Sequence, residues 1–437
     1  MHAVVLGLAR SGAAAARALL DAGATVTALD AADGPEQQAA AASVPGAIAL
    51  LGRTDGADVD GADLVVTSPG VAPSSVWIKA AEAAGIPVWS EIELAYRLGA
   101  RPLVAITGTN GKTTTTEMVT AALLADGRRA VSAGNIGHAL IQTLGGSHDA
   151  VVAEVSSFQL HGTDRFRAPV AVLLNIARDH LDWHGGHEAY AAAKARLFHN
   201  QGSEDFAIYH EDPACRAALN GAGARVPFDE EALPDGGAGI EAGWIVVPRG
   251  RVVKVGALQV RGRPHRADAV AAAAAAAAAG ADLEAIGEAL AAYQPRPHRI
   301  EIVATIDGVT YINDSKATDP HATLAALGEL DRVVLIAGGR NKGLDFEELT
   351  AAAPRLRAVI AMGESATEIV AVFEGTAVPV ETAGDMDDAV ARARRLTGSG
   401  DTVLLSPACA SFDMFNGYEA RGEAFREAVA RLGEESR

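Results

Sequence analysis

The chain has 437 residues, of which 49% are hydrophobic and 21% are charged, and its formal net charge is −18. This length predicts roughly two to four domains, because a single core seldom organises so many residues. The acidic balance argues against nucleic acid or an anionic membrane as the main partner, since both require an excess of lysine and arginine. Small anionic substrates are not excluded, because they need only a local group of basic residues.

Cysteine usage and hydropathy favour a cytoplasmic protein. Cys215 and Cys409 are far apart and show no metal-ligand spacing, which is typical of reduced thiols. The apolar N-terminus is interrupted early by Gly7 and Arg10, and no other apolar run is suited to cross a bilayer. We therefore expect no membrane insertion, and we expect a monomer.

The N-terminal part of the chain alternates strands with helices, which predicts a parallel α/β sheet. The predicted strands are 4–6, 25–29, 64–67 and 87–89, and the predicted helices are 13–22 and 92–98. After the first strand, Gly7-x-Ala9-x-x-Gly12 resembles a dinucleotide fingerprint, and Asp30 ends the next strand where a ribose contact would lie. An NAD site and a plain tight turn remain open, but we favour a site for another nucleotide. An oxidoreductase would leave the phosphate loop described next without a purpose.

The most informative segment follows a predicted strand at 103–107. Gly108-Thr-Asn-Gly-Lys-Thr113 leads into a predicted helix at 114–124, so backbone N–H groups and a helix N-terminus converge on one spot. Lys112 can reach the β- and γ-phosphates of a nucleotide, and the Thr113 hydroxyl can ligate Mg²⁺. The general phosphate-loop pattern has a glycine where this chain has Ile106, so the loop is a shortened variant. An ordinary Gly-rich turn is the alternative.

Further polar residues follow strands in the central part of the chain. Glu154 ends an apolar strand, where a carboxylate can bind Mg²⁺ or simply be solvated. Asp179, His180 and Asp182 crowd another strand-end loop and could ligate a metal, although a lone histidine is more often structural. Lys194 lies on a predicted helix and, taken alone, is typical of a solvated lysine.

The remaining predicted elements of this part include an antiparallel extension and an alanine-rich helix without a function of its own. They are strands at 130–132, 150–155 and 170–175, a helix at 188–198, an extension within 226–263, and helices at 269–279 and 283–293.

The C-terminal part begins after a Pro-rich boundary at 294–297 and predicts a third α/β unit. A hairpin is predicted at 300–306 and 309–313, followed by strands at 332–337, 358–362 and 402–406. Three loops that mix hydroxyls, small residues and cations follow strands; they are 312–319, 338–342 and 406–411. Such loops can face one cleft and suit an anionic substrate and a nucleotide. Cys409 lacks a nearby histidine, so packing is favoured over a nucleophilic role.

Taken together and in this order, the motifs resemble those of the Mur ligase family. The phosphate loop is shared across that family. Three other segments resemble its D-glutamate-adding branch; they are Ser156-Ser-Phe-Gln-Leu160, Asn313-Asp-Ser-Lys-Ala-Thr318 and Ser406-Pro-Ala-Cys-Ala-Ser-Phe-Asp413. The resemblance implies an α/β fold of three domains: a Rossmann-like UDP-binding domain at 1–98, a central P-loop-type ATPase domain with a parallel sheet at 99–295, and a Rossmann-like domain at 296–437.

The resemblance also implies an activity. It is the ATP-dependent addition of D-glutamate to UDP-N-acetylmuramoyl-L-alanine through an acyl phosphate, in cytoplasmic peptidoglycan precursor synthesis. Use of L-glutamate, a ligase similar to folylpolyglutamate synthase, and a non-catalytic nucleotide-binding protein remain alternatives.

Site residues are implied in five groups. ATP is expected to contact Gly108, Thr109, Asn110, Gly111, Lys112, Thr113, Thr114, Arg299 and Asp314. The UDP-muramoyl-alanine substrate is expected to contact Arg10, Ser11, Asp30, Ser68, Pro69, Gly70, Asn135, Ser156 and Gln159. D-glutamate is expected to contact Lys316, Thr318, Lys342, Ser411 and Tyr418. Two Mg²⁺ ions are expected at Thr113, Glu154, His180 and Lys194, and the expected catalytic residues are Lys112, Lys194, His180 and Glu154.

Two of these implied features concern single residues. Lys194 is expected as a carbamate formed with CO₂, because an ammonium cannot ligate Mg²⁺ whereas a carbamate supplies anionic oxygens. The segment His265-Arg-Ala-Asp268 departs from the family pattern, which has asparagines there. Asp268 therefore puts the adenine contacts in doubt, but not the reaction.

Overall fold

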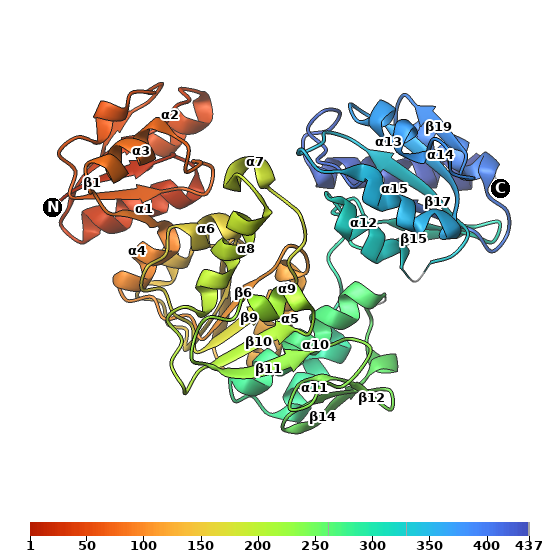
Figure 1. Cartoon of the computed structure of the whole chain (residues 1–437), viewed down its shortest axis with the longest axis horizontal. Helices are drawn as coiled ribbons and strands as arrows, with labels where there is room; N and C mark the ends of the chain where they lie inside the picture. The colour runs from red at the N-terminus through yellow and green to blue at the C-terminus, as the bar shows by residue number, and fades with distance from the viewer. Residues whose placement is uncertain (261, 329, 436–437) are drawn as a thin grey trace. The chain divides into compact units, whose positions relative to one another are not determined.

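The computed structural model describes residues 1–260, 262–328 and 330–435. The chain forms two compact units. The first contains 1–176, 183–257 and 268–292, and the second contains 177–182, 258–267 and 293–437. Figure 1 labels many of the helices and strands and colours the chain from red at the N-terminus to blue at the C-terminus.

The first unit opens with a five-stranded parallel sheet of strand order β3-β2-β1-β4-β5. Its strands are β1 (His2–Leu6), β2 (Thr25–Leu29), β3 (Ile48–Leu50), β4 (Leu64–Thr67) and β5 (Val88–Ser90). The accompanying helices are α1 (Arg10–Asp21), α2 (Pro35–Ala42), η1 (Gly56–Val59), α3 (Val76–Ala83) and α4 (Glu91–Arg97). The four predicted strands and both predicted helices are confirmed. The prediction missed α2 and β3, which carry no buried residue and so lack a hydrophobic period. It also missed η1 and α3, although α3 buries Trp77, Ile78 and Ala81.

A second parallel sheet in the same unit has the order β11-β10-β9-β6-β8-β7. Its strands are β6 (Val104–Thr107), β7 (Ala130–Gly134), β8 (Ala150–Glu154), β9 (Val170–Leu173), β10 (Phe206–His210) and β11 (Ala224–Phe228). Associated helices are α5 (Lys112–Ala125), η2 (Leu140–Thr143), α6 (Ser157–His161), α7 (Leu181–His184), α8 (His187–Ala195), η3 (Arg196–Phe198) and α9 (Pro213–Ala217). Strand β6 lies between β8 and β9, so the loops that follow these three strands meet at one edge.

The predicted antiparallel extension is confirmed as a three-stranded sheet, β12 (Gly239–Glu241), β13 (Trp244–Val247) and β14 (Gly250–Lys254). It is followed by η4 (Val255–Ala257), α10 (Arg263–Ala278) and α11 (Leu283–Ala292). The alanines of α10 from Ala269 to Ala277 are buried, so this helix belongs to the core. Near its end, Arg249 Nη1 donates hydrogen bonds to the carbonyl oxygens of Ala277 (3.0 Å) and Ala281 (2.7 Å).

The second unit contains a six-stranded sheet of order β15-β16-β20-β17-β18-β19. Its strands are β15 (Glu301–Ile306), β16 (Val309–Asn313), β17 (Val333–Gly338), β18 (Leu356–Met362), β19 (Val380–Ala383) and β20 (Thr402–Leu405). The helices are α12 (Pro320–Leu327), η5 (Phe346–Arg355), α13 (Ala366–Phe373), α14 (Met386–Leu396) and α15 (Tyr418–Glu435). The predicted hairpin is confirmed, since β15 pairs antiparallel with β16, and the other strand pairs are parallel.

Together these elements form a mixed α/β architecture with several parallel sheets. Among the described residues, no helix combines the length and hydropathy that crossing a membrane requires.

An ion-paired histidine ends β10. His210 Nδ1 lies 3.0 Å from Asp212 Oδ2, and Nε2 lies 3.0 Å from Glu230 Oε2. Burial opposes the charge on this ring, but the hydrogen bonds to the two carboxylates outweigh it and raise the pKa of His210 to about 9. His210, Asp229 and Glu230 have the spacing of a metal site. Because both ring nitrogens face carboxylates, however, the geometry favours an imidazolium over a metal ligand.

The raised pKa of His210 predicts a loss of stability in alkaline solution. A folded-state pKa above the ordinary value of 6.5 stabilises the fold fully below pH 6.5, and this contribution disappears as the pH rises through about 9. The free energy of unfolding, measured with urea, should fall between pH 6.5 and 9.5 in the wild type. It should fall less in His210→Gln, and equal slopes in both proteins would contradict the assignment.

Candidate functional site

The phosphate loop joins β6 to α5 through a glycine in the left-handed region. Gly111 has φ of 85° and caps α5, whose first residue is Lys112. The side-chain oxygen of Asn175, just beyond β9, accepts hydrogen bonds from the backbone N–H groups of Thr109 (3.0 Å) and Asn110 (2.9 Å). This contact fixes the loop, so that the first turn of α5 presents its N–H groups at the sheet edge, as an anion site requires.

Two lysine side chains converge on the carbonyl oxygen of Gly108. Lys112 Nζ donates to it at 2.9 Å and to Thr109 O at 2.8 Å, and Lys194 Nζ donates to it at 2.8 Å. Lys194 is only 1% exposed and lies 4.6 Å from the centre of the Tyr190 ring. Two ammonium groups that share one acceptor repel each other, so the arrangement suits either nearby anions or a change in the charge of one lysine.

The expectation that Lys194 taken alone is solvated is therefore wrong. Its helix, α8, carries Tyr190 one turn earlier, and the Tyr190 hydroxyl lies 2.9 Å from Thr109 Oγ1. This contact anchors α8 to the phosphate loop, and the lysine is buried as a result. The sequence motifs do not predict these roles of Asn175 and Tyr190, although the position of the polar Asn175 at the end of a predicted strand is one signal.

Glu154 lies at the end of β8, next to the strand that carries the phosphate loop. It pairs in register with Ile106 and is 2% exposed. Its Oε1 accepts a hydrogen bond from Asn135 Nδ2 at 2.7 Å, whereas the buried Oε2 has no hydrogen-bond partner among the residues that the structure describes. A buried carboxylate oxygen without a donor fits a cation ligand, and Mg²⁺ prefers such oxygens.

Asp268, the departure from the family pattern, packs against the phosphate loop. It is buried, and the Thr115 hydroxyl donates to its Oδ1 at 3.3 Å. A Cβ placed on Gly111 would lie 2.1 Å from the same oxygen. Position 111 therefore requires glycine for two reasons, its positive φ and the closeness of this carboxylate.

The residues expected at the UDP end connect the loops of the first sheet. Asp30 Oδ2 accepts a hydrogen bond from the backbone N–H of Leu8 at 2.7 Å, and Ser68 Oγ donates to Gly7 O at 2.8 Å. A Cβ on Gly12 would lie 1.9 Å from Gly7 O, so α1 approaches the preceding turn closely. The loops after β2, β1 and β4 thus meet at one edge, where Arg10, Ser11, Pro69 and Gly70 also lie.

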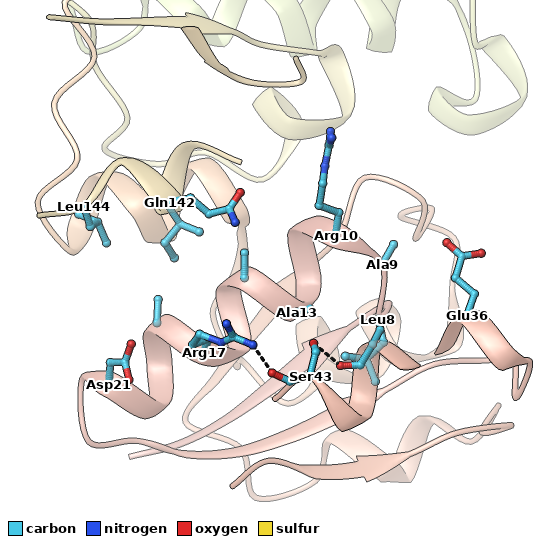
Figure 2. A pocket seen from close by; sticks show the side chains of 14 residues that line it. Leu8, Ala9, Arg10, Ala13, Arg17, Asp21, Glu36, Ser43, Gln142 and Leu144 are labelled. Carbon is cyan, nitrogen blue, oxygen red and sulfur yellow. Dashed lines mark hydrogen bonds between the residues drawn. The ribbon is translucent and has the colours of Figure 1, made fainter. Parts of the chain in front are cut away.

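A cavity of about 670 Å³ lies beside this edge (Figure 2). Side chains from α1, α2 and η2 line it, together with the loop residues Leu8 and Ala9. Arg10 is part of the lining, but Asp30 and Ser68–Gly70 are not. The cavity therefore flanks the predicted UDP region without containing all of it.

Ser156 and Gln159 form reciprocal hydrogen bonds at the start of α6. Ser156 Oγ accepts a hydrogen bond from the backbone N–H of Gln159 (3.2 Å), and Gln159 Oε1 accepts one from the backbone N–H of Ser156 (3.0 Å). This capping box shapes the turn after β8. A contact between either residue and the substrate stays a prediction.

In the second unit, the three predicted loops follow neighbouring parallel strands. Strands β16, β20 and β17 are adjacent, so the loops that begin at Asp314, Ser406 and Gly339 share one edge of the sheet. Asp314 is buried, which raises its pKa to about 7 although Ser406 Oγ donates to Oδ2 at 3.0 Å. The backbone N–H of Ile300 donates to Oδ1 at 3.2 Å, so Asp314 also ties the neighbouring Arg299 to this loop.

The residues expected to bind glutamate lie on these loops and on the first turn of α15. Lys316 Nζ lies 3.8 Å from the centre of the Tyr418 ring, and Ser411 is buried. Lys342 Nζ forms a 3.1 Å ion pair with Asp179 Oδ1, and Asp179 Oδ2 lies 3.2 Å from His180 Nε2. Burial raises the pKa of Cys409 to about 12, which agrees with packing rather than nucleophilic chemistry.

The predicted site residues are thus distributed over both units. The first contains Thr113, Glu154 and Lys194 from the expected metal set, and the second contains His180. The metal role of His180 stays a prediction.

Three family models match the chain in succession. They are described as "Mur ligase MurD-like, N-terminal domain" at residues 1–90, "Mur ligase middle domain" at 106–231 and "Mur ligase, glutamate ligase domain" at 298–409. This chain belongs to the Mur ligase family. The order of the three matches along the sequence agrees with the order in which the motifs occur.

Individual relatives match this Mur ligase over almost its whole length. A UDP-N-acetylmuramoylalanine–D-glutamate ligase of Frankia casuarinae is 49% identical and covers 98% of this chain and 94% of its own. The protein of the same name from Anaeromyxobacter dehalogenans is 44% identical, with coverages of 97% and 96%. Among solved structures, MurF from Acinetobacter baumannii matches with a TM-score of 0.62, 18% identity and coverages of 99% and 93%. That likeness shows the shared fold.

Gly111→Ala is predicted to damage the phosphate loop through its contact with Asp268. Left-handed backbone costs an alanine about 1–2 kcal/mol, and displacement of the carboxylate adds to that cost. Gly127→Ala is a matched control at the other end of α5, because Gly127 has φ of 82° and nothing within 4 Å of the added Cβ. Urea unfolding should show a larger loss in Gly111→Ala, and ATP binding measured by calorimetry should weaken only there.

A double variant separates the two causes. In Gly111→Ala/Asp268→Ala the carboxylate is gone, so part of the lost stability should return. If the two glycine variants lose equal stability, the close contact with Asp268 has no energetic consequence.

Proposed function

We propose that this Mur ligase adds D-glutamate to UDP-N-acetylmuramoyl-L-alanine at the expense of ATP. The observation that carries the proposal is the near-complete match, at 49% and 44% identity, to relatives named for this reaction. The site geometry supports it, because the phosphate loop, the orphaned oxygen of Glu154 and the buried Lys194 meet at one sheet edge. Such an edge is where open α/β sheets bind their ligands.

The three predicted domains divide the reactants in this proposal. The domain at 1–98 binds the UDP-muramoyl end, the domain at 99–295 binds the phosphates of ATP, and the domain at 296–437 binds glutamate and part of the nucleotide. The family models at 1–90, 106–231 and 298–409 fall within these three ranges.

The reaction must first activate a carboxylate, because oxide is a very poor leaving group. The alanine carboxylate attacks the γ-phosphorus of ATP, the bond from that phosphorus to ADP breaks, and an acyl phosphate forms. The glutamate amine then attacks the acyl carbon, inorganic phosphate leaves, and the amine loses a proton as the amide forms. In phosphoryl transfer the protein contributes mainly positioning and neutralisation of charge.

Lys112 is the residue that we assign to the transferred phosphate. It lies in the first turn of α5, and its ammonium donates hydrogen bonds to two phosphate-loop carbonyls. A polyphosphate can replace these weak neutral acceptors with charged oxygens, which form stronger hydrogen bonds with an ammonium. The positive end of α5 adds to the attraction.

Glu154, Thr113 and Lys194 would hold Mg²⁺, which supplies charge neutralisation at the phosphates when bound. The chemistry of Lys194 favours a carbamate there. The carbamate nitrogen keeps one N–H for Gly108 O, and its negative charge replaces the repulsion between two ammonium groups with attraction to Lys112. His180 is proposed as a further ligand.

The alternatives are weaker. A ligase similar to folylpolyglutamate synthase would not account for the match of residues 1–90 to a MurD-like N-terminal domain. A non-catalytic nucleotide-binding protein would not require both a buried lysine and a buried glutamate at the sheet edge of the phosphate loop.

A panel of amino acids tests the proposal. Phosphate release with ATP, Mg²⁺ and UDP-N-acetylmuramoyl-L-alanine should depend on D-glutamate and should be much slower with L-glutamate, L-alanine or D-aspartate. The product should have the mass of the substrate plus one glutamyl residue. Turnover that prefers another amino acid would replace D-glutamate in the proposal, and no turnover with any of them would refute it.

Two lysine variants test the assigned roles. Lys112→Ala and Lys194→Ala should each lower kcat by about 10²–10³-fold, the loss expected when a charge that stabilises the transition state is removed. The exposed Lys79→Ala on α3 is the control and should retain full activity. With ¹³C-labelled bicarbonate, a carbamate resonance should be present in the wild type and Lys112→Ala and absent in Lys194→Ala. Its presence in all three proteins would exclude Lys194 as the modified residue.

A further inference from the structure

Arg421 is among the largest fully buried side chains of the described residues, and none of the predicted roles uses it. It lies on the first turn of α15 and is 2% exposed. Burial lowers its pKa to about 10, although Asp413 opposes the shift, so the guanidinium remains charged at neutral pH. A charge kept inside a core costs free energy that an apolar side chain would not, which points to a role beyond packing.

The guanidinium donates hydrogen bonds to two loops at the edge of the C-terminal sheet and to the last residue of the strand that leads into the third loop. Nε donates to Ser315 Oγ (3.0 Å) and Nη2 to Ser315 O (2.8 Å), on the loop after β16. Nη1 donates to Cys409 O (3.1 Å), on the loop after β20, and more weakly to Gly338 O (3.4 Å), at the end of β17. The planar fork of an arginine holds its donors in fixed directions, so these contacts fix the separation of the loops.

The acceptors of Arg421 are close in sequence to residues predicted to bind glutamate. Ser315 precedes Lys316, Cys409 lies two residues before Ser411, and Gly338 lies four residues before Lys342. Ser315 Oγ in turn donates to Tyr418 O at 2.8 Å, which ties the Tyr418 ring and the Lys316 ammonium above it to the same cluster.

Backbone hydrogen bonds join these loops in pairs. Ala408 N donates to Ala317 O at 3.1 Å, and Gly338 N donates to Pro407 O at 2.8 Å. The packing around the guanidinium is also tight, since a Cβ on Gly339 would lie 2.2 Å from Ala410 O and 3.2 Å from Arg421 Nη1. A shift of the guanidinium would therefore be transmitted to the loops.

We propose that Arg421 is a positioning residue of the amino-acid site, which sets the spacing of the three loops so that their cations and hydroxyls match the two carboxylates of glutamate. This inference rests on the proposed function. Arg421 does not itself touch the substrate. It acts through Ser315, Cys409 and Gly338.

The inference predicts a selective loss of affinity for glutamate. Arg421→Lys keeps the charge but replaces the fork with a single ammonium, so it should raise the KM for D-glutamate about tenfold or more, as expected when binding groups move by about 1 Å. The KM for UDP-N-acetylmuramoyl-L-alanine should stay within about twofold of the wild type, because the first unit holds the residues predicted to bind it. Ser315→Ala removes one acceptor only, and should give a smaller increase in the KM for D-glutamate.

Controls separate positioning from stability. Arg431→Lys, on the exposed face of the same helix, should leave every constant unchanged. Thermal unfolding of each variant identifies loss of folded protein, which would lower kcat without altering the KM for D-glutamate. Such a result, or equal increases in both KM values, would overturn the inference. If the wild type does not use D-glutamate, the proposed function fails and the inference fails with it. If the wild type uses D-glutamate but the Arg421 variant has an unchanged KM for D-glutamate, only the inference is refuted.

Discussion

The carbonyl oxygen of Gly108 is the acceptor around which the phosphate-loop edge of the central sheet is organised. Gly108 is the first residue after β6, and the ammonium groups of Lys112 and Lys194 both donate to its carbonyl oxygen. Lys112 belongs to α5 and Lys194 to α8, so positive charges from two helices lie next to each other at this one oxygen. Two ammonium groups at one acceptor repel each other, and anionic ligands or a changed charge on one lysine would offset that repulsion. The phosphates and the carbamate of the proposed reaction provide both.

The C-terminal sheet has a different arrangement of buried positive charge, the single guanidinium of Arg421. This guanidinium donates to neutral acceptors on two loops and at the end of β17. Among the described hydrogen bonds, no second cation shares its Ser315 carbonyl. At the central sheet, two ammonium groups meet at one carbonyl oxygen of the phosphate loop. At the C-terminal sheet, one guanidinium joins loops that carry residues predicted to bind glutamate.

The sequence predicts much of this fold because parallel strands are continuous apolar runs that end in recognisable loops. The strands β1, β2, β4 and β6 were located from such runs, and the order of β16, β20 and β17 explains why three separate polar loops share an edge. Elements without a buried face, such as α2 and β3, carry no such signal. Contacts between distant segments could not be predicted from the sequence. The burial of Lys194 depends on the contact between Tyr190 and Thr109. The position of Asp268 depends on the packing of its helix, α10, near Thr115, which lies far earlier in the chain.

That helix, α10, has an unusual contact face. Alanine side chains are small and alike, so they interdigitate little with neighbouring elements. They do not by themselves fix the position of the helix along its own axis. Its register depends instead on polar contacts near its two ends, Asp268 with Thr115 and Arg249 with the carbonyls of Ala277 and Ala281. The number of residues between these two contacts therefore sets the distance between them along the helix. Deleting one alanine would shift an end by about 1.5 Å and turn it by about 100°, which would separate the Asp268 carboxylate from the phosphate loop while leaving the composition of the core almost unchanged.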